Sequence, residues 1–373
     1  MPFDPHPPPP RRGTTWHDGS GAVPGRAPAV AAWLLAVAAM VWVMVGLGGA
    51  TRLSGSGLSI MEWAPLSGTL PPMSDAEWQR LYDLYRTIPQ YALVNRGFGM
   101  EGFRQIFWLE YVHRLWGRLI GLAFALPLAW FWLRGSLPGA LRPRLLLLLG
   151  LGGLQGLIGW FMVASGFEAG RVAVSPYRLV IHLGLAFLIF ALLVWSALDL
   201  LAPAPASTPP ATRRLVRLAF GLAAATMLAG GFVAGIRAGL DYNSFPLMDG
   251  RLVPSGYLAH EPWWRAGFEH VATVQFNHRL LATATLVVGT VATAMAWPVR
   301  ALRPATSLFL LAIVAQYALG IATLLAVVPV GLGTAHQVLA VGVLAAGLVA
   351  VHATRALHPA AQRSVGRPMA RRP

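Results

Sequence analysis

The stretches Glu110-Tyr111-Val112-His113-Arg114 and Gln275-Phe276-Asn277-His278-Arg279 each place a histidine and an arginine at the head of a long apolar run. Each run has about twenty residues, which is enough for a helix to cross a bilayer. Glu110 and His113 fall on one side of such a helix, because residues three apart share a face. The second stretch keeps the histidine and has Gln275 in place of the glutamate. We therefore expect two similar membrane helices that carry the same candidate ligand and differ in the acid.

The composition predicts an all-α integral membrane protein. Of 373 residues, 56% are hydrophobic and only 12% are charged, which excludes a soluble enzyme. A span in lipid must satisfy its own backbone groups, and no segment alternates as a barrel strand does, so the spans must be helices. Eight apolar runs are found, near residues 29–49, 112–132, 145–164, 179–199, 217–236, 278–297, 306–328 and 333–353.

The charged residues predict the orientation in the membrane. A net charge of +15 would suggest nucleic acid for a soluble chain, but here the 29 basic residues are all arginine and are unevenly placed. Sixteen arginines and three acids lie in the tails and in the loops after the second, fourth and sixth spans. The positive-inside rule places this side, and both termini, in the cytoplasm. We expect no nucleic-acid partner. The absence of cysteine excludes disulfides, thiolate metal sites and covalently attached c-type haem.

The order of the spans divides the chain into two halves and three connecting segments. We expect a disordered cytoplasmic tail over 1–28, an N-terminal four-helix half over 29–200, a cytoplasmic linker over 201–216, a C-terminal four-helix half over 217–355 and a basic cytoplasmic tail over 356–373. The loop after the first span has about sixty residues and many aromatic side chains, which is unusual for an idle connection. It is predicted to form either amphipathic helices at the membrane surface or a lid over a site.

The second half repeats the first. Adding 165 to His113 gives His278, and adding 154 to His182 gives His336. Offsets of 182 and 161 relate further pairs, among them Gly49 and Gly231, Gly57 and Gly239, Arg142 and Arg303, Gln155 and Gln316, and Gly159 and Gly320. Four spans per copy give both copies the same orientation, so the repeat predicts two tandem four-helix bundles related by a pseudo-two-fold axis along the membrane normal.

Four histidines are the candidate metal ligands. His113, His182, His278 and His336 each lie near the outer end of an even-numbered span. A single intramembrane histidine is more often a polar contact between helices, but two at matched depth in each repeat favour ligation. Imidazole pairs without thiolates or repeated carboxylates suit haem iron better than zinc or a di-iron centre. Haem propionates would pair with arginines, and the candidates, which could instead be interfacial anchors, are Arg52, Arg114, Arg118, Arg178 and Arg279.

Several motifs resemble those of the haem A synthase family. They are EYVHR at 110–114, GATRLSGSGLS at 49–59, WAPLSGTLPP at 63–72 and YNSFPLMDG at 242–250. The resemblance covers about residues 30–355 and is closest to the cysteine-free branch of proteobacteria and mitochondria. It implies a multi-pass protein of the bacterial inner membrane that oxidises a ring methyl of haem O to a formyl group, making haem A for cytochrome oxidase. It further implies that His278 and His336 hold a permanent haem b, and that His113 and His182 flank the substrate haem, with both sites toward the periplasm.

The single acid fits this division of roles. Only the first half has a carboxylate, Glu110, beside its histidine, so we expect Glu110 to be catalytic, either as a proton acceptor or as a charge that stabilises a cationic intermediate. An ion pair with Arg114 or Arg118 is the structural alternative. Besides haem and membrane lipid, expected partners are haem O synthase, a quinone-like electron carrier and cytochrome oxidase assembly factors, and a homo-oligomer is left open. Two other functions use the same histidines: a di-haem quinol-linked electron-transfer cytochrome, and a repeat-built transporter with a proton relay.

Overall fold

The computed structural model describes residues 27–201 and 207–355, and in this part of the chain it contains helices and no β-strand. Eight helices are long and apolar enough to cross a membrane. They are α1 (Pro28–Leu53), α4 (Met100–Leu133), α5 (Arg142–Ala164), α6 (Pro176–Leu201), α7 (Pro210–Gly235), α9 (Val271–Ala296), α10 (Arg303–Leu325) and α11 (Val330–Ala353). The predicted all-α class and the eight spans are confirmed.

The shorter helices lie in the connections. They are α2 (Asp75–Tyr85), α3 (Pro89–Leu93), α8 (Trp263–Glu269) and five 3₁₀ turns, η1 (Ser67–Thr69), η2 (Gly139–Leu141), η3 (Ser165–Phe167), η4 (Ala238–Leu240) and η5 (Arg300–Leu302). Proline lies at the first or second position of five of the spans, at Pro28, Pro143, Pro176, Pro210 and Pro304. This position suits proline because its fixed φ is helical and the missing N–H would have no partner in the first turn.

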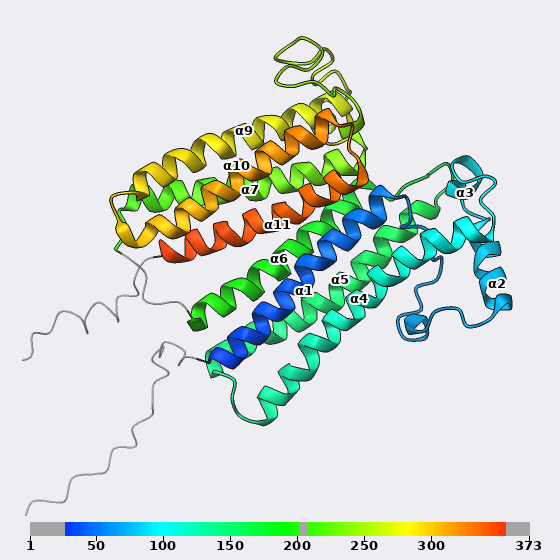
Figure 1. Cartoon of the computed structure of the whole chain (residues 1–373), viewed down its shortest axis with the longest axis horizontal. Helices are drawn as coiled ribbons and strands as arrows, with labels where there is room; N and C mark the ends of the chain where they lie inside the picture. The colour runs from blue at the N-terminus through cyan, green and yellow to red at the C-terminus, as the bar shows by residue number, and fades with distance from the viewer. Residues whose placement is uncertain (1–26, 202–206, 356–373) are drawn as a thin grey trace, which may run out of the picture.

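The spans form two groups of four that lie side by side (Figure 1). One group holds α1, α4, α5 and α6, and the other holds α7, α9, α10 and α11. Residues 28 and 355 lie at one end of the molecule, which we call the terminal end, and α2 and α3 lie at the other, which we call the α2–α3 end. The groups meet through α1, whose Trp42 indole donates to Val338 O of α11 at 2.8 Å. The pseudo-two-fold axis stays a prediction.

Several helix boundaries differ from the predicted runs. Helix α4 begins at Met100 instead of near residue 112, α7 at Pro210 instead of near 217, and α9 at Val271 instead of near 278. These first turns carry polar and aromatic residues that an apolar window does not detect, and the helix continues through them. The predicted linker 201–216 is therefore partly helical. Residues 202–206, and the predicted tails apart from residues 27 and 28, lie outside the described residues.

The added turns of α4 carry an aromatic cluster. Trp78 and Tyr85 of α2 pack against Phe103 and Phe107 of α4, and all four side chains are buried. Trp78 meets Phe107 with ring centroids 4.8 Å apart at 69°, an edge-to-face arrangement that favours aromatic pairs. Helix α2 thus packs on protein at the α2–α3 end.

Candidate functional site

One histidine in each half faces a glycine of the preceding span. A Cβ atom added to Gly48 of α1 would lie 3.3 Å from Nε2 of His113, and one added to Gly230 of α7 would lie 3.0 Å from Cε1 of His278. Both distances are shorter than ordinary van der Waals contact, so any residue larger than glycine would displace the imidazole. The two glycines are related by the sequence offset of 182, and the two histidines by 165. The repeat therefore brings the same pair of elements together twice.

The other two histidines repeat a second contact. His182 of α6 faces Gly159 of α5, and His336 of α11 faces Gly320 of α10, with added Cβ atoms 3.0 and 2.9 Å from the imidazole Cε1. In both cases a glutamine one turn earlier reaches the same residue. Gln155 Nε2 donates to His182 O at 3.1 Å and lies 3.2 Å from its Nδ1. Gln316 repeats this on His336 with distances of 3.0 and 3.2 Å.

The histidines form one pair in each half. His113 of α4 and His182 of α6 lie in the N-terminal half, and His278 of α9 and His336 of α11 lie in the C-terminal half. All four side chains are half-buried. Within residues 27–201 and 207–355, no group of three or more histidine, cysteine, aspartate or glutamate side chains could hold a metal ion. The donor set in each half is thus a pair of imidazoles, which fits the two axial positions of a haem iron and not a tetrahedral zinc site.

Two further features fit a haem at these pairs. His278 Nδ1 donates to Thr226 O at 3.1 Å, which leaves Nε2 with its lone pair free for a metal, the arrangement common for ligating histidines. Oε1 of Gln155 and Oε1 of Gln316 are buried and have no hydrogen-bond partner among the described residues. Buried polar atoms are normally paired, so two equivalent unpaired oxygens beside two equivalent histidines indicate a functional site.

Glu110 lies one turn before His113 and is buried, with 2% of its surface exposed. Its Oε2 accepts from the N–H and hydroxyl of Ser59, both at 2.7 Å, and from the Ile60 N–H at 3.0 Å. Its Oε1 accepts from Arg114 Nη2 at 2.7 Å and Nε at 3.1 Å. Of the two predicted ion-pair partners, Arg114 is the one in contact. The carboxylate thus joins α4 to the segment that follows α1.

Gln275 makes the matching connection in the second half, which the sequence did not reveal. It is equally buried, and its Nε2 donates to Ala238 O at 2.7 Å and Asp241 O at 2.6 Å. Arg279 donates to Gln275 Oε1 at 2.9 Å, as Arg114 does to Glu110. The offset of 165 that relates His113 to His278 also relates Glu110 to Gln275, so the sequence shows the equivalent position but not its hydrogen bonds. The difference lies in the hydrogen bonds: Glu110 accepts from its loop and Gln275 donates to its loop.

The predicted propionate arginines all have partners within the protein. Arg114 and Arg279 also hold carbonyls of the adjoining segments, Ile60 O and Tyr242 O. Arg118 donates to Ala64 O and Pro65 O at 2.9 and 3.0 Å. The remaining two bond to spans: Arg52 to Ala234 O at 2.6 Å and Arg178 to Phe161 O at 2.9 Å. One nitrogen each of Arg52, Arg118 and Arg279 is buried without a partner in the described part of the chain. These three retain capacity to bind an anion.

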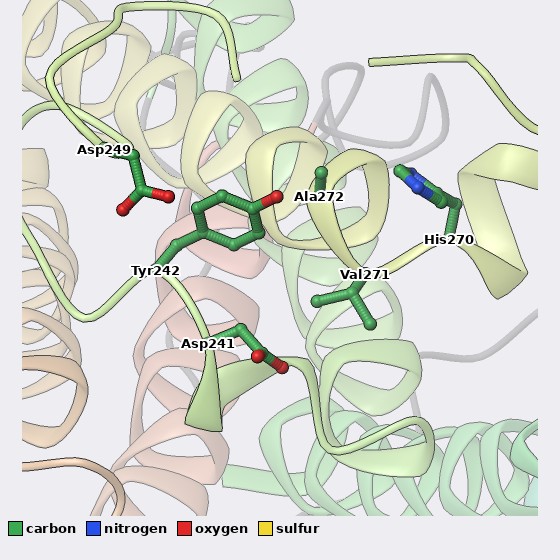
Figure 2. Close-up of a pocket in the computed structure, with 6 residues that line it drawn as sticks. All are labelled: Asp241, Tyr242, Asp249, His270, Val271 and Ala272. Atoms are coloured by element: carbon green, nitrogen blue, oxygen red, sulfur yellow. The ribbon is translucent and has the colours of Figure 1, made fainter. Parts of the chain in front are cut away.

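A separate cavity of about 320 Å³ lies at the α2–α3 end of the second half. Figure 2 shows Asp241, Tyr242 and Asp249 of the segment after η4 on one side, and His270, Val271 and Ala272 at the start of α9 on the other. Asp241 and Asp249 are exposed. The cavity contains none of the four candidate ligands, so the two histidine pairs are the candidate site.

Comparison with known proteins identifies the family to which this arrangement belongs. A family model described as cytochrome oxidase assembly protein matches residues 31–348, most of the chain. The chain belongs to the haem A synthase family of cytochrome oxidase assembly proteins. It is 55% identical to the haem A synthase of Granulibacter bethesdensis over 333 residues, which is 87% of both chains. The haem A synthase of Rhodospirillum centenum is 50% identical over 83% of this chain and 84% of its own length.

Family membership confirms the resemblance found in the motifs. The haem A synthase of Parvibaculum lavamentivorans is 48% identical over 87% of this chain and 94% of its own length. The match to the haem A synthase family includes all four histidines, Glu110 and Gln275, because it extends from residue 31 to residue 348. No solved structure matches the chain.

Proposed function

We propose that this protein oxidises a ring methyl group of haem O to a formyl group and so makes haem A for cytochrome oxidase. The observation that carries the proposal is the pair of imidazoles in each half of a chain that is 55% identical to a haem A synthase. The reaction makes it an oxidoreductase that acts at a methyl carbon. Two successive two-electron oxidations of that carbon, each adding a hydroxyl group whose oxygen comes from water or O₂, give a gem-diol, and loss of water from it gives the aldehyde. With water as the source, four electrons and four protons leave in total, and the electrons pass to a quinone-like carrier; with O₂ as the source, the carrier would instead supply two electrons in each step.

The two halves divide the work in this proposal. His113 and His182 hold the substrate haem, and His278 and His336 hold a permanent haem b, which would supply electron transfer when bound. The hydrogen bond from His278 Nδ1 to Thr226 O supports the second assignment, because it fixes the ring with Nε2 available. The imidazole of His113 makes no hydrogen bond among the described residues. A firmly held ligand suits a cofactor that stays, and a free one suits a substrate that leaves.

Glu110 is the proposed catalytic residue. Both carboxylate oxygens already accept hydrogen bonds, from Ser59, Ile60 and Arg114. To take a proton, Glu110 would have to give up one of these bonds, whereas it can oppose a developing positive charge without any rearrangement. Of the two predicted roles, we therefore favour stabilisation of positive charge at the methyl carbon. Its fixed position one turn from His113 suits this role, since preorganised charges cost no reorganisation during the reaction.

The proposal places the protein in a bacterial inner membrane with the terminal end in the cytoplasm. Both described ends of the chain lie at the terminal end, as the arginine distribution requires. The histidine pairs then lie toward the periplasm, near the α2–α3 end. Haem O synthase as donor of substrate, a quinone-like electron carrier and cytochrome oxidase assembly factors are the partners we propose.

Pigment analysis of the purified protein tests the function. We expect haem b together with haem O, haem A or a hydroxylated intermediate, identified by mass and absorbance after extraction. Two equivalents of haem b and no other haem would instead indicate an electron-transfer cytochrome. Absence of any Soret band would overturn both assignments and return the histidines to a transporter.

A further inference from the structure

The second and third spans of the two halves pack differently. In the C-terminal half, α9 and α10 are tightly joined. A Cβ atom added to Gly289 of α9 would lie 2.9 Å from Cδ1 of Ile313 of α10, so the two helices touch there. One turn toward the α2–α3 end, the Thr283 and Tyr317 hydroxyls are hydrogen-bonded at 3.0 Å. Ile313 is buried with 4% of its surface exposed. These contacts close the side of the bundle between α9 and α10.

Two of these four contact residues correspond to glycines in the N-terminal half, while Gly289 corresponds to Phe124 and Thr283 to Arg118. The offset of 161 relates Ile313 to Gly152 and Tyr317 to Gly156, and the offset of 165 relates Leu286 to Gly121. A Cβ atom added to Gly121, Gly152 or Gly156 would meet no described atom within 4 Å. All three glycines are exposed. These glycines could allow α4 and α5 to pack closely, but no described atom lies close to the side-chain position of any of them.

The share of buried residues shows the same difference for whole spans. In the most apolar stretch of α5, 6% of the residues are buried, against 17% for α10. The values for α4 and α9 are 11% and 28%. Small residues in membrane helices normally allow backbones to approach closely. Here they accompany the least buried pair of spans, so close packing does not account for them.

The open space around these glycines indicates a gap between α4 and α5, and this gap is closed at both of its ends. Toward the terminal end, Leu145 and Leu148 of α5 share a buried cluster with Phe124 and Leu128 of α4. Toward the α2–α3 end, the segment 59–65 crosses from α4 to α5. Trp63 of this segment stacks on Trp160 of α5 with ring centroids 6.3 Å apart at 13°. The remaining opening therefore faces sideways, toward the lipid.

Polar groups beside the opening are suited to a haem. Arg118 of α4 occupies the position of Thr283, and its Nη1 is buried without a hydrogen-bond partner in the described structure while its other nitrogens hold Ala64 O and Pro65 O. Gln155 of α5, with its unpaired Oε1, lies between Gly152 and Gly156 and contacts His182. The unpaired Nη1 of Arg118 could bind a haem propionate, and Gln155 connects this region to His182 of the histidine pair.

We propose that the gap between α4 and α5 is a lateral port through which the haem substrate passes between the lipid and the pair His113 and His182. This rests on the proposed function. The contacts of Ile313 and the Thr283–Tyr317 hydrogen bond close the same route in the C-terminal half, so that its haem stays. The occupant is a planar, largely apolar tetrapyrrole, because the port opens to lipid and leads to two imidazoles.

Filling the port with the side chains of the closed half tests the proposal. In detergent, haem O is mixed with purified protein that carries its C-terminal haem, and binding is followed by the Soret absorbance. We expect Gly152→Ile combined with Gly156→Tyr to slow haem O uptake at least tenfold. Gly150→Leu is the matched control, because Gly150 is also exposed on α5, also has open space around it, and has a leucine, Leu311, at its equivalent position. The control should take up haem O at the wild-type rate.

The outcomes separate the port from the proposed function. Uptake by the wild type and equally fast uptake by the double variant would overturn the port alone. No uptake by the wild type would overturn the proposed function and the port with it. The converse variant, Tyr317→Gly, removes the Thr283–Tyr317 hydrogen bond and should let added haem exchange with the resident haem. A C-terminal haem held as firmly as in the wild type would contradict the closing role of this hydrogen bond.

A labelling experiment avoids dependence on bulky substitutions. The chain has no cysteine, so Gly156→Cys provides a single thiol for a maleimide. We expect the thiol to react before haem O is added and to react at least tenfold more slowly afterwards. Gly150→Cys should react at the same rate in both states. Equal labelling of Gly156→Cys with and without haem O would overturn the port.

Discussion

Glu110 and Gln275 occupy equivalent positions in the two halves, and each joins its helix to the segment that follows the preceding span. The directions of their hydrogen bonds to that segment are opposite. Glu110 accepts from the N–H groups of Ser59 and Ile60, and Gln275 donates to the carbonyls of Ala238 and Asp241. A glutamine at position 110 would have only one oxygen for Arg114 and the two N–H groups. The loops of the two halves therefore present opposite backbone groups, and each side chain fits only its own loop.

Glu110→Gln is expected to lower haem A formation by about 100-fold or more, the usual scale for the loss of one preorganised electrostatic group at a reacting centre. The C-terminal haem b should be retained, because His278 and its bond to Thr226 O are in the other half. Product is measured by extraction and chromatography, and haem b by its reduced-minus-oxidised spectrum. Glu101→Gln, at an exposed acid in the first turn of the same helix, is the control and should keep most of the activity. A Glu110→Gln protein that forms haem A at the normal rate would disprove the catalytic role.

At the scale of elements, the glycine that faces each histidine sets the spacing of two helices. Gly230→Ala is expected to displace His278, because the new Cβ atom would lie 3.0 Å from its Cε1. Overpacking of this kind costs about 1–3 kcal/mol, which corresponds to roughly tenfold weaker haem retention. Gly221→Ala, on the same helix with no described atom within 4 Å, is the matched control. The haem-to-protein ratio after purification is the measurement, and equal ratios in the two variants would contradict the spacing role.

The connection between α2 and the segment after α1 should respond weakly to pH. A bidentate hydrogen bond from Arg80 lowers the pKa of Glu62 below its usual 4.5. The depressed pKa means that the ion pair contributes fully above pH 4.5 and is lost as pH falls through the lowered value. Both side chains are about half exposed, so the contribution is at most about 1 kcal/mol.

Arg80→Gln tests this contribution. The variant should melt slightly below the wild type at pH 7, and the difference should be smaller at pH 3, because part of Glu62 is protonated as the pH falls below 4.5. Intrinsic tryptophan fluorescence during heating provides the measurement, since Trp63 and Trp78 lie in this region. A melting difference of the same size at both pH values would show that the effect does not come from the charge of Glu62.

The membrane spans could be predicted from the sequence, whereas the contacts between the spans and their connecting segments at the α2–α3 end could not. Lipid requires long apolar runs, so the core of each helix is visible in composition, but the first turns of α4 are polar and aromatic and depend on packing with α2. The falling offsets of the repeat relate His113 to His278 and His182 to His336, and in the structure each histidine of a related pair faces an equivalent glycine. Arg118 and Gln275 donate to backbone carbonyls, which every residue has, so the sequence does not show which residue supplies the acceptor.

At the scale of the molecule, the two halves are joined near both ends. Near the α2–α3 end, Arg52 at the end of α1 donates to Ala234 O of α7. At the terminal end, Asp199 of α6 contacts His352 of α11, with 3.0 Å between Oδ1 and Nε2. His352 is buried and Trp195 packs edge-on against its ring at 5.0 Å. Asp199 and His352 belong to none of the sequence motifs, and their contact links the two halves.

Asp199 is the centre of this link. Its Oδ2 accepts from Arg144 Nη1 of α5 at 2.9 Å while Oδ1 contacts His352, so one carboxylate holds three helices from both halves. Asp199→Asn removes the charge and leaves one acceptor for two donors. Charge-assisted hydrogen bonds contribute about 1.5–3 kcal/mol, and partial exposure of the side chain, 28%, reduces this to about 1 kcal/mol.

The loss should appear as a lower melting temperature and as separate unfolding of the two halves. Tryptophan fluorescence reports the whole chain, and release of the C-terminal haem reports one half, so the two transitions should coincide in the wild type and separate in Asp199→Asn. Asp83→Asn is the control, because its partner Arg86 lies three residues away and both are exposed. If Asp199→Asn and Asp83→Asn melt alike and both keep coincident transitions, the contacts of Asp199 do not hold the two halves together.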